Sequence, residues 1–563
     1  MRRLFSIAVC LALSAMLGRA QAPRFPFPQH TPYWPGTVLP SHVSRAEMDD
    51  STRVFYDRWK AKYLRAGCSP GHFFVWFDDY DPDPGDTTMC VSEGQGYGML
   101  ITAFMAGYDS SARTLFDGLY YYFRAHPAAQ NPDLMAWRQV SNCMTIPGSD
   151  DNSATDGDLD IAYALLLADR QWGSAGPVNY RQEALAVCSG ILQEEINRSD
   201  YSVELGSWVV PGSSYLFSTR TSDFMPDHFR AFEAVAGNPA WLQVRERCYD
   251  IVRTLQHTAS PLTGLLPDFA VDLNTSPQPA APNFLESAHD GHYYWNACRT
   301  PWRLGLDYVL SGDTGAYAAL QKINGWIRTK TAGNPAVIRA GYRLTGSQIA
   351  SYGSTAFTAP LAVSAMVSSE HRQWLNALWD RIVSTPLEAE GYYENSLKML
   401  VLLAVSGNWW TPAALAPAFQ CSVTIGWNLV SVPVRVGNWL AGSLYAGSSS
   451  PVYRFIPNSG YVAAETLARG EGYWVKFPSD RTVAFAGTTR ELDTIDLHPG
   501  WNIIGSLASP VLVDSLSSIP PSLSLSPFYG WGGTFTPVDT LLPGKGYWVK
   551  SSGAGGLVLR AIR

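Results

Sequence analysis

The run ATDGDLDIAYALLLADRQW, residues 154–172, decides the fold class, because its middle part is apolar on every side. A helix without a polar face has to be enclosed by other helices. The runs GMLITAFMAG at 98–107 and YYENSLKMLVLLAV at 392–405 have the same character. Together these runs predict an inner layer of buried helices.

Amphipathic runs alternate with the buried ones over most of the first 410 residues. AEMDDSTRVFYDRWKAKYLR at 46–65 and VNYRQEALAVCSGILQEEIN at 178–197 each combine an apolar with a polar face, which is typical of a helix that covers a core. One outer helix paired with one inner helix, repeated about six times, predicts an all-α double ring of the (α/α)6 barrel class. We assign residues 21–415 to this helical domain.

The character of the chain changes after residue 418, where short β-type runs lie between Gly, Pro and Ser. The run GWNLVSVPV at 426 recurs as GWNIIGSLA at 500, and GEGYWVK at 470 recurs as GKGYWVK at 544. Both recurrences are 74 residues apart, which indicates a duplicated unit. We therefore predict an all-β region of two modules, residues 419–490 and 491–563.

Composition indicates a folded chain of two or three domains. The 563 residues are 46% hydrophobic, 13% aromatic and 16% charged, which excludes a disordered protein. The many rings fit either large cores or a groove paved with aromatic side chains, and composition does not decide between them.

The N-terminus has the features of an export signal. Two arginines, a short apolar run and small residues predict a signal peptide over residues 1–20 and a secreted, extracellular protein. No other stretch approaches the length of a membrane span, so none is expected. Without the signal, 38 basic residues face 48 acidic ones, and this negative balance argues against nucleic acid as a partner.

Metal-binding patterns are missing from the sequence. The eight cysteines are scattered without CxxC spacing, and His289 and His292 stand in a loop without a cluster of further ligands. We therefore expect no metal and no other cofactor. One pair, such as Cys68 and Cys90, could close in an oxidising compartment, and most other cysteines should be buried small hydrophobes.

Carboxylates gather in two segments. In VSEGQGYGM, Glu93 precedes glycines at 94, 96 and 98, whose missing β-carbons would let a ligand approach the backbone. The alternative for Glu93 is a helix N-terminal acid stabilised by the macrodipole. In residues 154–160, Thr155 and Asp158 have capping-box spacing, whereas Asp156 and Asp160 share a face, so at least one acid should face a ligand.

These segments resemble signatures of glycoside hydrolase family 8. Residues 154–172 resemble the main family signature, and VSEGQGYGM resembles its acid segment. TSDFMPDHFRAF at 221–232 and NACRTPWR at 296–303 are similar to later segments, so the resemblance covers roughly residues 30 to 410. It implies an (α/α)6 barrel and inverting hydrolysis of β-1,4-linked chains of glucan or chitosan type.

The resemblance also implies roles for single residues. Glu93 takes the position of the general acid, and Asp156 that of the aspartate that contacts the sugar at subsite −1. Many family members have an aspartate as general base where this chain has Asn296, and an amide cannot take a proton from water. The chain resembles the family branch of chitosanases and some β-glucanases, in which a glutamate from the preceding loop is the base.

Glu286, in NFLESAHDGHYYWNACR, fits the position of that glutamate. Asp290 is its nearest competitor, and a more distant acid or no base at all stays open. Asn296 would then orient the attacking water. Inverting enzymes need about 6.5–9.5 Å between the two carboxyl groups to admit that water.

Further residues are candidates for substrate binding. Trp137 resembles a family sugar-stacking position, with packing as the alternative. Arg299 is expected either to pair with a catalytic carboxylate or to cap a helix. Tyr392 or Tyr393 could place a hydroxyl near the base, and Asp223 could pair with an amine of chitosan.

The repeated rings Tyr473–Trp474 and Tyr547–Trp548 suggest sugar binding by the β-modules. Neighbouring side chains of a strand point to opposite faces, however, so one ring of each pair should lie in a core. We favour packing for these rings, and attachment of the modules to cell wall or polymer stays open.

The leading hypothesis is a secreted, monomeric, inverting endo-glycosidase that cuts β-1,4 linkages of the polysaccharide chitosan or β-glucan. One alternative is an endo-β-1,4-glucanase or licheninase without chitosanase activity. The other is a non-catalytic carbohydrate-binding surface protein that has lost its base, which Asn296 permits.

Overall fold

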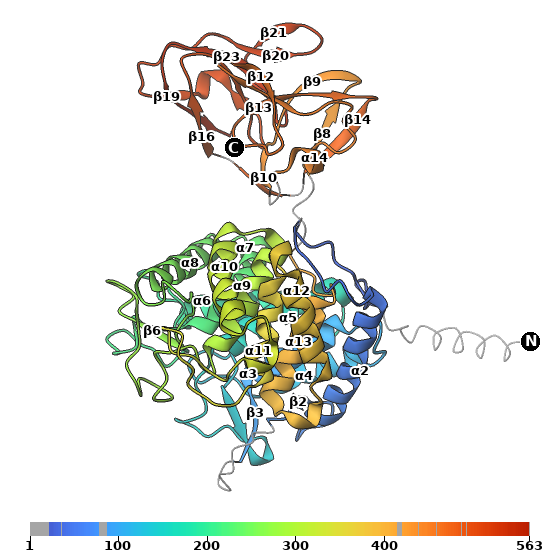
Figure 1. The fold of residues 1–563 in the computed structure, drawn as a ribbon, viewed down its shortest axis with the longest axis vertical. Helices are drawn as coiled ribbons and strands as arrows, with labels where there is room; N and C mark the ends of the chain where they lie inside the picture. Colours follow the sequence, from blue (N-terminus) through green and yellow to red (C-terminus); the bar gives the residue numbers. More distant parts are fainter. Residues whose placement is uncertain are drawn as a thin grey trace, which may run out of the picture. The chain divides into compact units, whose positions relative to one another are not determined.

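The computed structural model describes residues 22–34, 36–77, 87–413, 419–436, 439–457, 459–485, 487–490 and 492–561. The predicted signal peptide, residues 1–20, and the predicted boundary at 415 lie outside these ranges. The chain divides into two compact units, Met1–Ala413 and Ala414–Arg563, each of which is described by itself (Figure 1).

The described part of the first unit contains twelve α-helices in two layers. The inner layer consists of α3 (Ser92–Phe104), α5 (Thr155–Trp172), α7 (Pro226–Ala236), α9 (Thr300–Ser311), α11 (Thr355–Ala365) and α13 (Tyr392–Val405). The outer layer consists of α2 (Arg45–Tyr63), α4 (Ala112–Ala125), α6 (Tyr180–Glu194), α8 (Ala240–Thr258), α10 (Thr314–Lys330) and α12 (Arg372–Ser384).

Each inner helix contacts the next inner helix along the chain, and α13 contacts α3. Each inner helix also contacts one outer neighbour: α3 contacts α4, α5 contacts α6, α7 contacts α8, α9 contacts α10, α11 contacts α12 and α13 contacts α2. This arrangement is consistent with a helical barrel, and the three apolar runs of the sequence form inner helices as predicted (Figure 1).

The inner helices are buried because their side chains are apolar on all sides. In α5, Leu159, Ile161 and Leu165 are fully buried, and every residue of α11 is buried. A fully buried Leu or Ile side chain contributes about 1.5–3 kcal/mol to folding. The outer helices bury one face only, as the amphipathic runs predict.

The glycines of α3 have another role than the one predicted from the sequence. A β-carbon at Gly94 would lie 2.7 Å from the Tyr392 hydroxyl, and one at Gly96 would lie 2.8 Å from Cβ of Asp160. At Gly98 it would overlap Val75. The glycines therefore admit neighbouring parts of the protein, and the expected approach of a ligand to this backbone is wrong.

The predicted capping box of α5 is also wrong. Thr155 Oγ1 donates to the carbonyl of Glu204 (2.7 Å), and Asp158 Oδ1 accepts from the N–H of Met135 (2.9 Å). The helix has no side-chain cap at its N-cap residue, Ala154. Both side chains are fully buried, so they bind backbone groups of neighbouring segments, which local spacing does not reveal.

Short antiparallel strands connect the helices of the first unit. They are β1 (Leu64–Ala66), β2 (Phe73–Val75), β3 (Thr88–Val91), β4 (Arg138–Val140), β5 (Thr219–Arg220), β6 (Phe269–Val271) and β7 (Gln278–Pro279). β1 pairs with β2, β3 pairs with β4, and β5, β6 and β7 form one sheet. β3 runs directly into α3, and β4 begins directly after Trp137.

One disulfide bond joins two of these connections. It links Cys68 to Cys143, so the suggested pair of Cys68 and Cys90 is wrong. Cys90 is a buried free thiol, and burial raises its pKa far above the usual range. The other free cysteines of the described ranges, Cys188, Cys248, Cys298 and Cys421, are also buried, as predicted.

The second unit is rich in β-strands, and its two halves have the same strand order. The first half orders four strands as β12-β11-β13-β9, and the second orders four as β21-β20-β23-β17. These strands are β9 (Gly426–Ser431), β11 (Tyr453–Ile456), β12 (Gly460–Ala463), β13 (Gly472–Phe477), β17 (Gly500–Ile504), β20 (Phe528–Trp531), β21 (Phe535–Val538) and β23 (Tyr547–Ser551).

Smaller sheets complete the second unit. They consist of β8 (Phe419–Val423), β10 (Val434–Val436), β14 (Arg481–Phe485), β15 (Gly487–Thr489), β16 (Leu492–Leu497), β18 (Val511–Leu512), β19 (Ser517–Ile519), β22 (Thr540–Leu541) and β24 (Gly555–Arg560), with one short helix, α14 (Ala441–Leu444). None of the helices in the described ranges is long and apolar enough to cross a bilayer.

Strand alternation places the repeated rings as predicted. Tyr473 and Tyr547 are buried in two separate hydrophobic cores. Their neighbours Trp474 and Trp548 lie on the other face, in a cluster that contains side chains from both halves of the unit. One ring of each pair therefore belongs to a core.

The disulfide bond should contribute to the stability of the first unit, because it closes a segment of 75 residues. We expect Cys68→Ser to lower the free energy of unfolding by about 2–4 kcal/mol, as measured by denaturant titration. The double variant Cys68→Ser/Cys143→Ser should lose no more free energy of unfolding than the single variant. Reductant should lower the free energy of unfolding of the wild type to that of the variants. Unchanged denaturation midpoints in all variants would contradict this contribution.

Candidate active site

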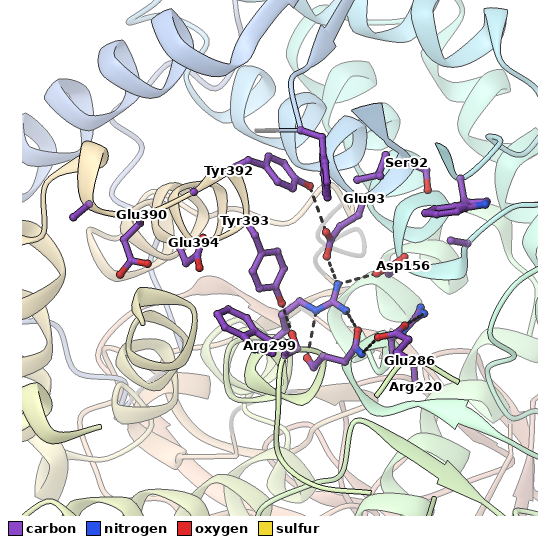
Figure 2. Close-up of a pocket in the computed structure, with 18 of the residues that line it drawn as sticks. Ser92, Glu93, Asp156, Arg220, Glu286, Arg299, Glu390, Tyr392, Tyr393 and Glu394 are labelled. Atoms are coloured by element: carbon purple, nitrogen blue, oxygen red, sulfur yellow. Dashed lines mark hydrogen bonds and ion pairs between the residues drawn. The ribbon is translucent and has the colours of Figure 1, made fainter. Parts of the chain in front are cut away.

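A cavity of about 850 Å³ opens in the helical unit where several inner helices begin. The first turns of α3, α5 and α13 and the segment before α9 contribute side chains to it (Figure 2). Of the residues predicted from the sequence, these line the cavity: Glu93, Trp137, Asp156, Glu286, Asn296, Arg299, Tyr392 and Tyr393. The chain thus brings together eight side chains that are up to 300 residues apart.

Arg299 lies at the centre of the polar groups and is only 2% exposed. Its Nη1 contacts Glu93 Oε1 and lies 2.8 Å from Asp156 Oδ2. Its Nη2 donates to Asn296 Oδ1 (3.0 Å) and to Ser222 Oγ (2.9 Å). Of the two roles expected for Arg299, pairing with a catalytic carboxylate fits the structure (Figure 2).

Glu93 has an environment that favours its protonated form more than the surroundings of an ordinary glutamate do. The hydroxyl of Tyr97 donates to Oε1 (2.9 Å) and that of Tyr392 to Oε2 (3.3 Å). Burial raises the pKa of Glu93 and the charge of Asp156 adds to this, while Arg299 and Tyr97 oppose it only in part. The pKa therefore lies above the usual glutamate value, which suits a general acid.

Asp156 has the opposite electrostatics at almost the same place. Burial by itself raises the pKa of Asp156, but the positive charges of Arg299 and Arg220 outweigh burial and lower it below the usual value. The carboxylate also accepts the N–H of Gly157 (2.9 Å). Two neighbouring carboxyl groups whose pKa values are moved apart are suited to two different roles.

Glu286 reaches the cavity from the loop between β7 and α9, and its side chain is 44% exposed. Arg220 Nη2 donates to Oε1 (3.1 Å), and Asn296 Nδ2 donates to Oε2 (2.7 Å). Hydrogen bonds therefore connect Glu93 to Glu286 through Arg299 and Asn296, although the two glutamates make no direct contact.

Asp290, the competitor of Glu286, anchors the loop that carries Glu286. It is fully buried and accepts the backbone N–H groups of Leu285 (2.7 Å), Glu286 (3.0 Å) and Ser287 (2.7 Å). It is not among the side chains that line the cavity. The geometry thus favours Glu286 over Asp290 as the group that meets a substrate.

Two other expectations do not fit the structure. The Tyr392 hydroxyl contacts Glu93, and the Tyr393 hydroxyl donates to the carbonyl of Trp295 (2.7 Å), so neither is placed at Glu286. Asp223 is fully buried beside Arg220 (3.5 Å) and does not line the cavity. Burial raises the pKa of Asp223 to about 7, against the opposing effect of Arg220.

For Trp137 and Asp160 two roles were open, contact with a ligand or packing within the protein, and the structure separates the two residues. Trp137 is half-buried at the cavity wall, where its Nε1 donates to the Ser149 carbonyl (3.1 Å) and part of its ring stays open. Asp160 is fully buried between Arg303 (2.6 Å) and His228 (2.9 Å) and has a structural role. Of the pair Asp156 and Asp160, only Asp156 faces the cavity.

Several lining residues were not predicted from the sequence. They are Phe77, Arg220, Trp295, Tyr352, Glu390 and Glu394. Arg220 directly precedes the segment TSDFMPDHFRAF, and Glu390 and Glu394 flank the predicted tyrosines, so proximity to these segments was the available signal. In the described ranges, no cluster of His, Cys, Asp and Glu side chains could hold a metal ion.

Comparison with known proteins shows which family and which sequences are similar to this chain. The profile of "Glycosyl hydrolases family 8" matches residues 57–407. A beta-glucanase of Niallia circulans is 46% identical over 390 residues, which cover 69% of this chain and 92% of the relative. Endoglucanase A of Acetivibrio thermocellus is 30% identical over 422 residues, 72% of this chain and 80% of the relative.

A solved structure is similar to the same part of the chain. The apo structure of a beta-1,3-1,4-glucanase from Paenibacillus sp. X4 is 46% identical and superimposes with a TM-score of 0.66. It covers 69% of this chain and 100% of its own. The matched residues of the family profile end before the β-rich unit begins.

The charge of Arg299 should stabilise the fold in a pH-dependent way. In Arg299→Gln the ionised Asp156 loses its counter-ion and Glu93 loses the positive charge that opposes the rise of its pKa, so we expect a loss of about 3–5 kcal/mol at pH 7.5. Without Arg299 both pKa values rise in the folded state, so the folded protein binds more protons than the unfolded one and stability recovers as the pH falls toward 5.

Thermal denaturation at pH 5, 6 and 7.5 measures this effect. Arg181→Gln, at an exposed ion pair with Asp169, is the matched control and should show no such recovery. Equal losses for Arg299→Gln at all three pH values would contradict the proposed pairing.

Proposed function

The chain belongs to glycosyl hydrolases family 8, and from this premise we propose that it is an inverting endo-β-glucanase that hydrolyses β-1,4 linkages of a β-glucan. The observation that carries the proposal is the pair of glutamates, Glu93 and Glu286, that line one cavity, the first mostly buried against Arg299 and the second exposed beside Arg220. The relatives named beta-glucanase and endoglucanase support the substrate class.

Glu93 acts as the general acid in this proposal. It transfers its proton to the glycosidic oxygen while the bond from that oxygen to the anomeric carbon breaks. The raised pKa favours the protonated form of Glu93 before the reaction, and Arg299 stabilises the carboxylate that is left behind. Glu93 recovers its proton from solvent after the product leaves.

Glu286 acts as the general base. It takes a proton from a water whose oxygen bonds to the anomeric carbon on the face opposite the leaving group, which inverts the configuration. Its exposed side chain can reach solvent, and Arg220 and Asn296 fix both carboxylate oxygens.

Asn296 is placed to position the base. One end of its amide donates to Glu286, and the other end accepts from Arg299. We therefore assign to Asn296 the orientation of Glu286 in addition to the predicted orientation of the water. A basic side chain at position 296 is not needed. The carboxylate of Glu286 can accept a proton from water, which the amide of Asn296 cannot do.

Asp156 and the rings bind the sugar. The ionised Asp156 accepts hydrogen bonds from the hydroxyl groups of the sugar at subsite −1 and favours positive charge at its anomeric carbon. Trp137 offers an open part of its ring to a sugar face. A purely carbohydrate-binding protein would not need two carboxyl groups with distinct protonation behaviour, so we favour an enzyme.

Replacement of the base tests this mechanism. We expect Glu286→Gln to lower kcat on soluble β-glucan by at least about a hundredfold, because the amide cannot accept a proton from water. Azide, an external nucleophile small enough to occupy the position of the water, should restore part of the activity. Reducing ends and the anomeric form of the product are the measurements.

The matched control for Glu286→Gln is Glu394→Gln, the same substitution in the same cavity. Near-wild-type turnover of the Glu286 variant would remove this residue as the base. Full activity of Asn296→Ala would in turn remove the positioning role of the amide.

Chitosan is the second candidate substrate, and the acidic lining of the cavity favours it. Besides Glu93, Asp156 and Glu286, the cavity exposes Glu390 and Glu394, which lie in Figure 2 on the side opposite Glu286. Carboxylates placed along a cleft attract the ammonium groups of a polycationic chain.

Substrate choice can be measured with barley β-glucan and chitosan. We expect reducing ends from β-glucan, and if chitosan is also cut, Glu394→Gln should lower turnover of chitosan by about tenfold and that of β-glucan by much less. Release of reducing ends from chitosan alone would make chitosan the first candidate substrate and β-glucan the second. No release from either polymer by the folded protein would overturn the proposed function.

We propose in addition that the helices close into an (α/α)6 barrel and that the β-rich unit arose by duplication. The contact of α13 with α3 supports closure, and the shared strand order of the two halves supports duplication. Export through the signal peptide at residues 1–20 also remains our proposal. The Cys68–Cys143 disulfide supports export, because such bonds persist in oxidising compartments.

A further inference from the structure

A second cavity lies in the β-rich unit and has a volume of about 430 Å³. All of its lining side chains are aromatic: Trp427, Tyr453, Tyr461, Trp474, Trp531 and Phe535. None of the assigned functions uses this cavity, and its lining residues lie outside the residues matched by the family profile.

Both halves of the unit build this aromatic cavity. Trp427 and Trp474 come from β9 and β13 of the first half, and Trp531 and Phe535 come from β20 and β21 of the second. Ring centroids of Trp474 and Trp531 are 5.1 Å apart, and those of Trp531 and Phe535 are 4.9 Å apart. Trp531 Nε1 donates to the carbonyl of Trp427 (3.0 Å), so the halves are joined at the cavity itself.

An equivalent set of rings continues beside the first one. Trp501 and Tyr529 are 6.1 Å apart, as are Trp427 and Tyr453 in the first set. The two sets are linked through Tyr461, which lines the aromatic cavity and lies 5.7 Å from Phe455. Phe455 is 4.8 Å from Trp548, which in turn is 5.9 Å from Trp501. The rings therefore form a surface longer than the cavity, which suits a chain better than a single small molecule.

Packing of the fold explains only part of this ring set, because Trp474 is buried in a small cluster with Leu429 and Ile503. The two larger cores of the unit lie on other faces of the strands, around Tyr473 and Tyr547. Trp427 is 43%, Tyr461 55% and Phe535 50% exposed. Contiguous exposed apolar surface is rare on monomeric proteins and marks a binding site.

We propose that this aromatic surface binds a segment of an uncharged β-linked glucan chain. The axial C–H groups of a β-pyranose form a flat apolar face that packs on the electron-rich face of an aromatic ring. The cavity lining has no acid, lysine, arginine or histidine, so a polycation or a polyanion would find no counter-ion there. This lining without charged groups differs from that of the active-site cavity, which contains five acidic residues and two arginines.

The identity of the polymer rests on the proposed function of the helical unit. A chain held by the aromatic surface stays near the catalytic cavity of the same molecule, because the two units share one polypeptide. The surface therefore concentrates the enzyme on its polymeric substrate and has no effect on short soluble ones.

Binding of the full-length protein to polymer tests the proposal. We compare wild type with Trp427→Ala/Phe535→Ala by affinity electrophoresis in barley β-glucan and by sedimentation with insoluble cellulose. The double variant should bind at least about tenfold more weakly, because each lost ring removes a stacking contact. Its kcat/KM on short soluble cello-oligosaccharides should stay unchanged, which reports that the helical unit is folded. The near-UV circular dichroism of the double variant, followed through thermal denaturation, checks that the β-rich unit is folded as well.

Tyr461→Ala, at the most exposed ring, is the second variant and should weaken binding in the same direction. Leu512→Ala removes an exposed apolar side chain (45% exposed) outside the cavity and should bind like wild type. Wild-type binding by all ring variants would overturn the proposal. So would a dimer in sedimentation velocity that the ring variants convert to monomer without a change in polymer binding.

The outcome also separates this proposal from the proposed function. Binding that depends on the rings, in a protein that hydrolyses no glucan, supports the aromatic site and overturns the catalytic assignment. If the protein hydrolyses glucan but its polymer binding does not depend on the rings, the catalytic assignment is supported and the aromatic site is overturned.

Discussion

A buried guanidinium, that of Arg299, is the constraint on which the active site depends. It connects the first turns of α3 and α5 with the segment before α9 through Glu93, Asp156 and Asn296. A buried positive charge is tolerated only with such partners, so the positions of the helices and the protonation of the acids are fixed together. The charge of Arg299 lowers the pKa of Asp156 and limits the rise that burial causes in the pKa of Glu93.

The rest of the helical unit can be understood as support for this group. The inner helices α3, α5 and α13 present their first turns to one cavity, and glycines in α3 allow α5 and Tyr392 to come close enough for the acids to meet Arg299. Helix N-termini suit carboxylates because of the macrodipole, which explains why acids gather at this end.

Features that depend on local sequence could be predicted. The apolar run of α5 identified an inner helix, and the resemblance of short motifs selected Glu93, Asp156 and Glu286, which the structure places in one cavity. Features that depend on contacts between distant segments could not. The partner of Cys68, the buried hydrogen bond of Asp158 and the contribution of Arg220 all follow from how loops far apart in the chain pack together.

The anchoring of the loop at Asp290 has a consequence for catalytic rate. Three backbone N–H groups of this loop donate to the one buried carboxylate of Asp290. The backbone that carries Glu286 is therefore held by the protein's own contacts, which suits the role of base that we propose for it. In the enzyme that we propose, such an anchored loop adds no disorder-to-order step to the cycle, so bond cleavage or departure of the cut chain should set the speed of turnover.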